Sequence, residues 1–329
     1  MAAAEERAFL ELARPGRRFV LTTHVQPDAD GIGSELALAA LLRALGAEAR
    51  IVNADPLPAA LAFLDEAGEA ATYDPLAHDP LFAGADAIVM LDNSDPARLG
   101  SLEPVVRTSA ARTVSIDHHP DPDPFWSLLV VRTGVSSTAE VVFGLARTAG
   151  VELPPAAARA LYAGLVGDTG RFRFGSTSAD AFAMAAELVR AGVSPAAMFA
   201  RMEECVSGPY MKLLGHALGS AELLEGGRLV VLTVPRALVL ELGAEGEDTS
   251  EIINESLRLG TSRIAVLFRE QADGRTKVSL RSKGSIDVNR VARRHGGGGH
   301  RNASGIVLAL PPDETRRRLL PELVELAAE

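Results

Sequence analysis

Short apolar runs alternate with helix-compatible segments through the first half of this 329-residue chain. Such alternation predicts an α/β fold with a doubly wound, mainly parallel sheet, because parallel neighbours must be joined by crossover helices. The expected strands are 18–24, 49–53, 85–91 and 112–116. A helix is expected over 34–45, ending before Gly46, and a helical segment around 104–107. In such sheets, ligands bind beyond the carboxyl ends of the strands.

The second half reads as a helical stretch followed by a smaller α/β domain with a mixed sheet. Helices are expected over 138–149, 155–166, 178–191 and 195–204. Strands are expected over 229–234, 263–269, 276–281 and 304–308, and Asp273-Gly274 is typical of a hairpin turn. We therefore divide the chain into domains 1–190 and 220–329, with a helical connector over 191–219.

Clusters of His and Asp follow the predicted strands of the first domain. They are His24, Asp28 and Asp30; Asp92; Asp117, His118 and His119; and, further along, Asp168. Because the carboxyl ends of parallel strands share one edge of the sheet, these side chains should open onto one crevice. Carboxylates gathered in a crevice repel one another unless a cation lies among them. The clusters therefore predict a pair of divalent metal ions.

The spacing within the clusters suggests how two ions would be shared. Asp28 and Asp30 lie two residues apart, so on a nearly extended turn they could serve neighbouring ions, and Gly31 and Gly33 would then let the backbone enter a helix. The two carboxylate oxygens of Asp92 could bridge both ions.

The second ion would take its remaining ligands from later in the chain. His118 would supply a nitrogen, and Asp168 would complete the shell. Each residue also has a structural alternative: a hydrogen-bonded histidine, a helix cap or a polar loop. Four separate structural explanations, one for each cluster, account for the pattern less simply than one metal site does.

Composition excludes several classes of function. The formal net charge of −10 argues against a protein that grips long nucleic acid electrostatically. Cys205 is the only cysteine, so no disulfide and no thiolate metal cluster can form within one chain. The first residues carry acids where a signal peptide has bases, and no apolar run approaches the roughly 20 residues that span a bilayer. We expect a cytoplasmic protein without a membrane partner.

A run of four glycines, 296–299, marks the second domain. Gly297, Gly298 and Gly299 would let the backbone approach an anion closely, with His300 and Arg301 beside them. Arg281 and Ser282, on a predicted strand, are suited to a phosphate or a base. The alternative is a flexible surface loop, which the adjoining apolar strand disfavours.

These residues carry a family resemblance. The His-x-x-x-Asp-x-Asp segment from His24, together with Asp92, the Asp-His-His signature at 117–119 and Asp168, resembles the four motifs of the DHH phosphoesterase superfamily. Residues 277–282 and 296–305 resemble its associated substrate-binding domain. In length and motif order the chain is similar to the bacterial nanoRNase and pAp phosphatase family. The resemblance makes 1–190 a metal-binding catalytic domain and 220–329 a substrate-binding domain.

The resemblance also implies roles for single residues. One ion would be held by His24, Asp28 and Asp92, and the other by Asp30, Asp92, His118 and Asp168, with manganese the usual metal. Asp117 would orient a histidine. His119 would contact the phosphate and stabilise charge or protonate the leaving oxygen. Asp92, Asp117, His118 and His119 are thus the implied catalytic set.

By the same resemblance, the substrates would be short oligoribonucleotides, linear dinucleotides such as pApA, and 3′-phosphoadenosine 5′-phosphate (pAp). Two divalent ions, roughly 3.5–4 Å apart, would activate a water for attack on phosphorus. A cleft between two domains would accept a few nucleotides and reject a duplex. Two alternatives stay open: a cyclic-dinucleotide phosphodiesterase, and a non-catalytic nucleotide sensor. A homodimer is expected from the resemblance alone.

Overall fold

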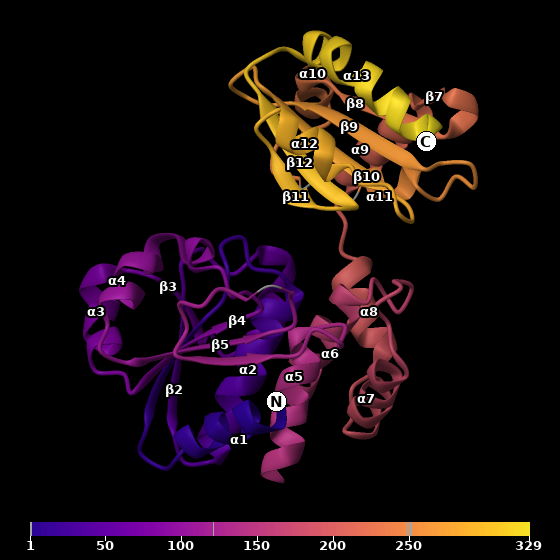
Figure 1. The fold of residues 1–329 in the computed structure, drawn as a ribbon. Helices are drawn as coiled ribbons and strands as arrows, with labels where there is room; N and C mark the ends of the chain where they lie inside the picture. The colour runs from indigo at the N-terminus through magenta and orange to yellow at the C-terminus, as the bar shows by residue number, and fades with distance from the viewer. Residues whose placement is uncertain (1, 121, 248, 250–251) are drawn as a thin grey trace. The chain divides into compact units, whose positions relative to one another are not determined.

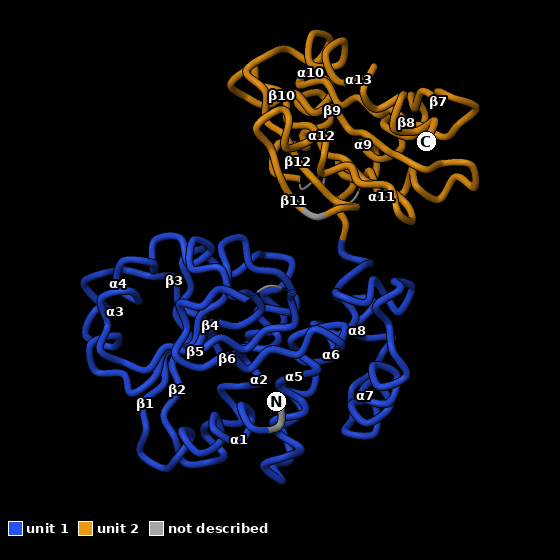
Figure 2. The backbone as a smooth tube through the Cα atoms, viewed as in Figure 1, with its two compact units in different colours: residues 1–205 blue, residues 206–329 orange. Residues whose placement is uncertain are grey.

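The structure, a computed structural model, describes residues 2–120, 122–247, 249 and 252–329. It divides into two compact units, residues 1–205 and 206–329 (Figure 2). The division falls within the segment 191–219. Each unit contains one six-stranded sheet with its own core.

The sheet of unit 1 is entirely parallel. Its strands are β1 (Arg18–Thr22), β2 (Glu48–Asn53), β3 (Ala70–Thr72), β4 (Ala87–Leu91), β5 (Arg112–Asp117) and β6 (Leu128–Val131). They lie in the order β3-β2-β1-β4-β5-β6, and every neighbouring pair is parallel. The order reverses between β1 and β4, which confirms the doubly wound sheet. A crevice at such a reversal is where ligands bind in this architecture.

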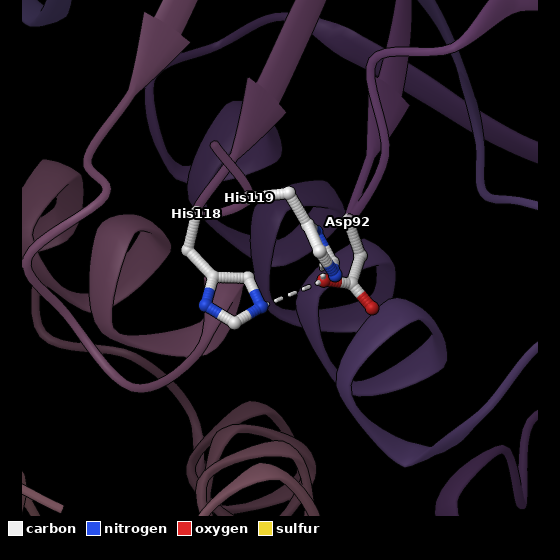
Figure 3. A group of neighbouring side chains, drawn as sticks. All are labelled: Asp92, His118 and His119. Carbon is white, nitrogen blue, oxygen red and sulfur yellow. Dashed lines mark ion pairs between the residues drawn. The ribbon is translucent and has the colours of Figure 1, made fainter. Parts of the chain in front are cut away.

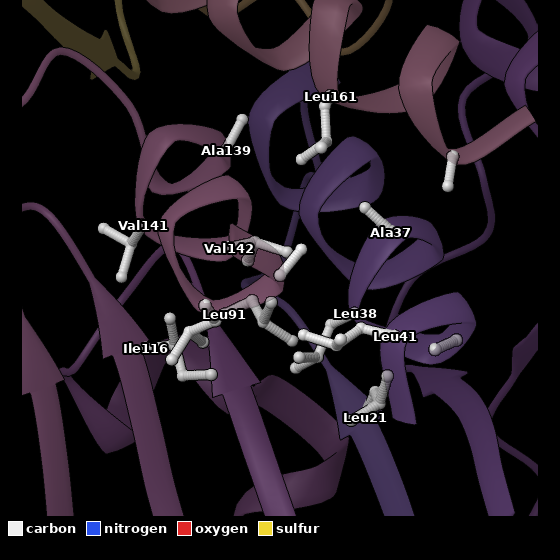
Figure 4. Packing of buried hydrophobic residues seen from close by; sticks show 14 of the residues in the cluster. Leu21, Ala37, Leu38, Leu41, Leu91, Ile116, Ala139, Val141, Val142 and Leu161 are labelled. Carbon is white, nitrogen blue, oxygen red and sulfur yellow. The ribbon is translucent and has the colours of Figure 1, made fainter. Parts of the chain in front are cut away.

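Helices cover both faces of this sheet (Figure 1). The helices of unit 1 are α1 (Ala2–Leu12), α2 (Ala29–Ala44), η1 (Ala59–Leu64), α3 (Pro75–Ala83), η2 (Pro96–Leu102), α4 (Glu103–Thr108), α5 (Thr138–Ala149), α6 (Pro155–Asp168), α7 (Ala179–Arg190) and α8 (Pro195–Glu203). Of these, α7 and α8 pack against α6 and not on the sheet. Successive strand residues face opposite sides, so Leu21 and Leu91 pack under α2, α5 and α6 (Figure 4), whereas Val20 and Met90 pack against the side of α3, η2 and α4.

Helix α2 begins earlier than the sequence suggested. We expected it to start at Ser34, after two glycines, but it starts at Ala29, because the Asp28 side chain caps it by accepting hydrogen bonds from the Asp30 and Gly31 amides. The glycines serve close packing instead. A Cβ on Gly31 would lie 2.4 Å from Thr23 Oγ1, and one on Gly33 would lie 2.3 Å from the Ala160 carbonyl oxygen of α6.

Unit 2 is built on a mixed sheet. Its elements are α9 (Gly208–Gly219), β7 (Glu222–Leu224), η3 (Glu225–Gly227), β8 (Leu229–Val234), α10 (Arg236–Glu241), α11 (Ile252–Ser256), β9 (Ile264–Glu270), β10 (Thr276–Ser282), α12 (Asn289–Arg294), β11 (Gly298–His300), β12 (Ala303–Leu308) and α13 (Pro312–Ala328). The order is β11-β12-β10-β9-β8-β7, with only β8 and β9 parallel. This confirms the smaller mixed domain and the hairpin at Asp273-Gly274.

The glycine run is more regular than expected. Four consecutive glycines disfavour regular structure, yet Gly298–His300 forms β11 and pairs antiparallel with β12. Missing side chains permit the close approach, since a Cβ on Gly297 would lie 2.1 Å from the Gly305 carbonyl oxygen. Glycine at 297 is therefore required by its packing against β12, whether or not a ligand binds nearby.

Within the described residues, no single helix is both long and apolar enough to cross a membrane. Helices α7 and α8 meet those two requirements only when taken together, as a pair bent by 106°.

Candidate metal centre

Three adjacent strands deliver the first donor residues to one edge of the unit 1 sheet. His24 follows β1 by two residues, Asp92 follows β4 directly, and Asp117 is the last residue of β5. These strands are neighbours in the order β1-β4-β5. Two helices complete the set, because Asp28 caps α2 and Asp168 is the last residue of α6. The convergence expected from the sequence is therefore present.

Asp92 lies at the middle of the cluster. It is 2 % exposed, and its φ of +62° is unusual for a residue with a side chain. Its Oδ2 lies 3.7 Å from His24 Nε2, and its Oδ1 lies 3.6 Å from His118 Nε2. Figure 3 shows the imidazoles of His118 and His119 turned toward this carboxylate. Each Asp92 oxygen thus faces a different imidazole.

Three groups of donor atoms contain Asp92. In each group the ligand atoms lie within 4.8 Å of one another; two of the groups are Asp30, Asp92, His118 and Asp168, and His24, Asp28 and Asp92. A third group combines Asp92 with His118 and His119. The first two contain the residues that the resemblance implied as ligands of the two ions.

Asp30 is held by the amino end of α5. Its Oδ2 accepts a hydrogen bond from the Thr138 amide at 2.6 Å, and its Oδ1 accepts one from the Ala139 amide at 2.9 Å. These amides have no partner within the helix, and the helix dipole favours a negative charge there. Burial nevertheless raises the pKa of Asp30 well above its usual range, and the nearby carboxylates of Asp92 and Asp168 add to the rise.

The pKa values of the two imidazoles inside the cluster, His24 and His118, are raised by the neighbouring carboxylates. Burial disfavours protonation of His24, but Asp28 and Asp92 outweigh it and raise the pKa of His24 to about 10. Burial likewise opposes protonation of His118, yet Asp168 and Asp92 raise its pKa to about 9. The carboxylates thus create a strongly negative potential at both imidazoles. A divalent cation would neutralise the same potential.

The environment of one buried nitrogen, His118 Nε2, is direct evidence for a cation site. His118 Nε2 is buried and has no hydrogen-bond partner in the described part of the chain, although Asp168 Oδ2 lies 3.1 Å away. A nitrogen left without a hydrogen bond among carboxylates is costly unless a metal ion takes its lone pair. Mixed imidazole and carboxylate donors suit divalent ions such as manganese, iron and zinc. The residues present therefore fit divalent metal ions.

Asp117 contacts the other histidine of its motif. Its Oδ1 accepts hydrogen bonds from His119 Nδ1 at 2.8 Å and from the amides of His118 and His119. The cost of burying Asp117 is outweighed chiefly by the hydrogen bond from His119, which lowers the pKa of Asp117 and raises that of His119. These hydrogen bonds fix the orientation of the His119 ring.

The predicted substrate-binding residues lie on two strands of unit 2 and in the turn that follows one of them. Arg281 and Ser282 end β10, and the run 297–299 leads into β11. Arg301 lies in the turn from β11 to β12. In the sheet, β12 lies between β10 and β11. The Ser282 hydroxyl is occupied within the fold, since it donates to the Ile286 carbonyl at 2.7 Å and accepts from Asn302 Nδ2 at 2.8 Å. The side chain of His300 lies outside the described part of the chain.

The sequence interpretation missed two residues at the metal centre. Thr138 donates its hydroxyl to Asp92 Oδ1 at 2.9 Å, and Arg98 Nη2 lies 2.7 Å from His24 Nδ1. Thr138 had a usable signal, because Ser137, Thr138 and Glu140 form a helix-start pattern before an apolar helix. Arg98 had none, since an arginine six residues after Asp92 fits many loops.

Comparison with known proteins agrees with this geometry. Residues 18–165 match the DHH family, N-terminal domain, and residues 226–329 match the DHHA1 domain. A bifunctional oligoribonuclease and PAP phosphatase NrnA of Thermus thermophilus is 35% identical over 306 residues, covering 93% of this chain and 89% of that protein. The protein of the same name from Bacillus subtilis is 32% identical, covering 87% and 88%.

A solved structure has the same fold. The exopolyphosphatase-related protein of Bacteroides fragilis superposes with a TM-score of 0.94 at 25% identity, covering 99% of this chain and 98% of that one. The resemblance drawn from the four motifs and the glycine run is thereby confirmed. The chain belongs to the DHH family of phosphoesterases, enzymes that hydrolyse phosphate esters, in the branch of the bifunctional oligoribonucleases and PAP phosphatases.

Proposed function

We propose that this protein is a manganese-dependent phosphoesterase that uses two metal ions. It hydrolyses short oligoribonucleotides and linear dinucleotides such as pApA to mononucleotides, and pAp to AMP and phosphate. The observation that carries the proposal is the pair of donor groups that share Asp92. The names of the relatives from Thermus thermophilus and Bacillus subtilis support the choice of substrates.

The ligand assignment follows the two groups. One ion is held by His24, Asp28 and Asp92, and the other by Asp30, Asp92, His118 and Asp168. When bound, the two ions supply an activated water and neutralise the phosphate oxygens. The Thr138 hydroxyl and the amino end of α5 fix the orientations of Asp92 and Asp30, so that these carboxylates need little rearrangement.

His119 acts on the substrate in this proposal. With Nδ1 bonded to Asp117, its Nε2 is directed away from the carboxylate and can donate a hydrogen bond or a proton to the phosphate or its leaving oxygen. The hydrogen bond to Asp117 raises the pKa of His119, which favours its protonated form. Asp117 acts through His119 and is a positioning residue.

Unit 2 carries further groups that can bind a phosphate. Arg281, Arg301 and the open edge of strand β11 supply cationic and N–H donors for a phosphate group, since a charged hydrogen bond to phosphate is stronger than a neutral one. The Gly297 amide is not among these donors, because it donates to the Ala292 carbonyl at 2.9 Å. We assign His300 and Ser282 to the same region.

The test compares Asp92→Asn with the wild type. With manganese present, we expect the wild type to release phosphate from pAp and mononucleotides from pApA, and Asp92→Asn to lose at least about 10³-fold in kcat/KM together with bound manganese. Asp74→Asn is a matched control, because Asp74 only caps α3 and asparagine caps equally well. Turnover of a cyclic dinucleotide alone, or nucleotide binding without turnover, would contradict the proposal.

A further inference from the structure

The loop after Asp92 is built to bring one arginine beside His24. The Trp126 indole donates to the Ser94 carbonyl at 2.6 Å, and the Ser115 hydroxyl donates to the Asn93 carbonyl at 3.1 Å. Further on, the Val25 amide donates to the Arg98 carbonyl at 2.8 Å. The backbone of Arg98 is therefore fixed against the segment that carries His24.

A glycine makes this approach possible. Gly100 has a φ of +55°, and a Cβ there would lie 2.4 Å from Val25 Cγ1. Any other residue would push the Arg98 loop away from the His24 segment. The position of Arg98 is thus set by the surrounding fold and not only by a flexible side chain.

The guanidinium of Arg98 has no acidic partner among the described residues, although four candidate carboxylate ligands, Asp28, Asp30, Asp92 and Asp168, form the metal centre. Its Nη2 lies 2.7 Å from His24 Nδ1 and 3.3 Å from the Val25 carbonyl oxygen, and the residue is exposed. An exposed arginine beside a negative cluster normally pairs with a carboxylate. This one faces an imidazole instead.

The hydrogen bonds around His24 leave that guanidinium available. His24 Nε2 faces Asp28 and Asp92, each at 3.7 Å, so it is the nitrogen that can ligate a metal. Nδ1 then carries the hydrogen, which it donates to the Val25 carbonyl oxygen at 2.8 Å. In that arrangement Nδ1 and Nη2 both carry hydrogens, so their 2.7 Å contact is no hydrogen bond and the guanidinium would have to move away from His24. Most of the N–H donors of Arg98 are then left for an anion.

We propose that Arg98 binds the phosphate group of the substrate at the rim of the metal centre, on the side of His24. This inference rests on the proposed function, and it adds a substrate-contacting cation from unit 1 to those assigned in unit 2. A guanidinium can hold two phosphate oxygens at once and stabilise charge that increases during attack on phosphorus.

Binding measurements separate this role from support of His24. Isothermal titration calorimetry should show that Arg98→Met binds manganese as the wild type does, but binds inorganic phosphate, at saturating manganese, about tenfold or more weakly. Its kcat/KM for pAp should fall about 10²-fold, and Arg98→Lys should recover part of both losses. Arg112→Met, which removes an exposed arginine at the amino end of β5, is the control and should change neither.

Two results would overturn the inference. Weaker manganese binding with unchanged phosphate affinity would make Arg98 a support for His24, and no change in either would make it an ordinary surface residue. Failure of the proposed function is seen separately, as a wild type that turns over neither pAp nor pApA. The phosphate titration still tests Arg98 in that case.

Discussion

The side chains of Glu35 and Asn53 form a buried pair next to the metal centre. Glu35 Oε2 accepts a hydrogen bond from Asn53 Nδ2 at 2.9 Å, and Asn53 Oδ1 accepts one from the Thr23 amide at 3.0 Å. This chain of contacts links α2 to the residue before His24. Glu35 is fully buried, and its Oε1 has no partner within the described residues, so burial raises the pKa of Glu35 to about 8.

Glu35→Gln should therefore change how stability depends on pH. Below its ordinary pKa of 4.5, Glu35 is protonated in both the folded and unfolded states. Between 4.5 and about 8 the unfolded chain loses that proton while the folded one keeps it. The free energy of unfolding then falls as pH rises, by at most about 1.4 kcal/mol per pH unit. Glutamine keeps the acceptor for Asn53 and removes this slope.

The single tryptophan, Trp126, is buried in unit 1, so its fluorescence reports unfolding of this unit. In urea titrations from pH 5 to 8, the variant should gain stability relative to the wild type as pH rises. A constant difference between the two proteins across that range would show that Glu35 is already ionised in the folded state.

Asp117→Asn should impair proton transfer without loss of metal. The hydrogen bond from His119 to Asp117 raises the pKa of His119, so removing the negative charge should lower it. If protonated His119 serves the leaving oxygen, the alkaline limb of the pH–kcat profile moves to lower pH. We expect kcat to fall about 10- to 100-fold, with bound manganese unchanged.

Asp123→Asn is the matched control in the following loop, where the carboxylate accepts a hydrogen bond from the Phe125 amide at 2.8 Å and has no histidine partner among the described residues. It should leave the profile in place. A parallel loss of manganese in Asp117→Asn would instead assign Asp117 to support of the metal ligands.

The sequence predicted the strand ends well because burial and strand period are local properties. Leu21 and Leu91 lie in continuous apolar runs, and the polar residues that follow them mark where burial stops. Short edge strands such as β3 and β6 carry no comparable signal, since a strand of three or four residues is defined by its neighbour. Their pairing could not be read from their own residues.

Contacts between distant segments were beyond the sequence for a different reason. From the sequence, Gly33 looked like a turn residue. In the structure a side chain is excluded at this position by the Ala160 carbonyl of α6, which lies far along the chain. Arg98 likewise became visible only once the Asp92 loop was seen beside Val25. Local patterns predict which residues are polar or small. They do not predict which distant backbone segment packs against those residues.

Gly298→Ala tests whether the glycine run contacts the substrate. Among the described residues, no atom lies within 4 Å of the position of a Cβ on Gly298, so alanine should leave the stability of unit 2 unchanged. A methyl group on a backbone that approaches a phosphate should nevertheless raise KM about tenfold or more. Michaelis–Menten kinetics with pAp and a urea titration followed by circular dichroism make the two measurements.

Gly297→Ala provides the contrast. Its Cβ would lie 2.1 Å from the Gly305 carbonyl oxygen, so this variant should destabilise the pairing of β11 with β12. If Gly298→Ala left KM unchanged while Gly297→Ala behaved as described, the run would be a requirement of the sheet alone.

Gly33→Ala should disturb the metal centre by separating two helices. The added Cβ would meet the Ala160 carbonyl oxygen at 2.3 Å, and backbone atoms of α2 and α6 must move apart to admit it. We expect the free energy of unfolding of unit 1 to fall by about 1–3 kcal/mol. Because α2 carries Asp30 and α6 ends in Asp168, manganese should also bind more weakly.

Gly215→Ala is the helical control for this comparison. Gly215 lies inside α9 with no atom within 4 Å of its Cβ position, so alanine there should stabilise the helix by about 0.5–1 kcal/mol and leave manganese binding unchanged. The Gly33 variant could keep full stability and metal affinity only if α2 and α6 were free to separate. In that case their spacing would not position Asp30 and Asp168, and the ligand geometry would have to be set by the strand ends and α5 alone.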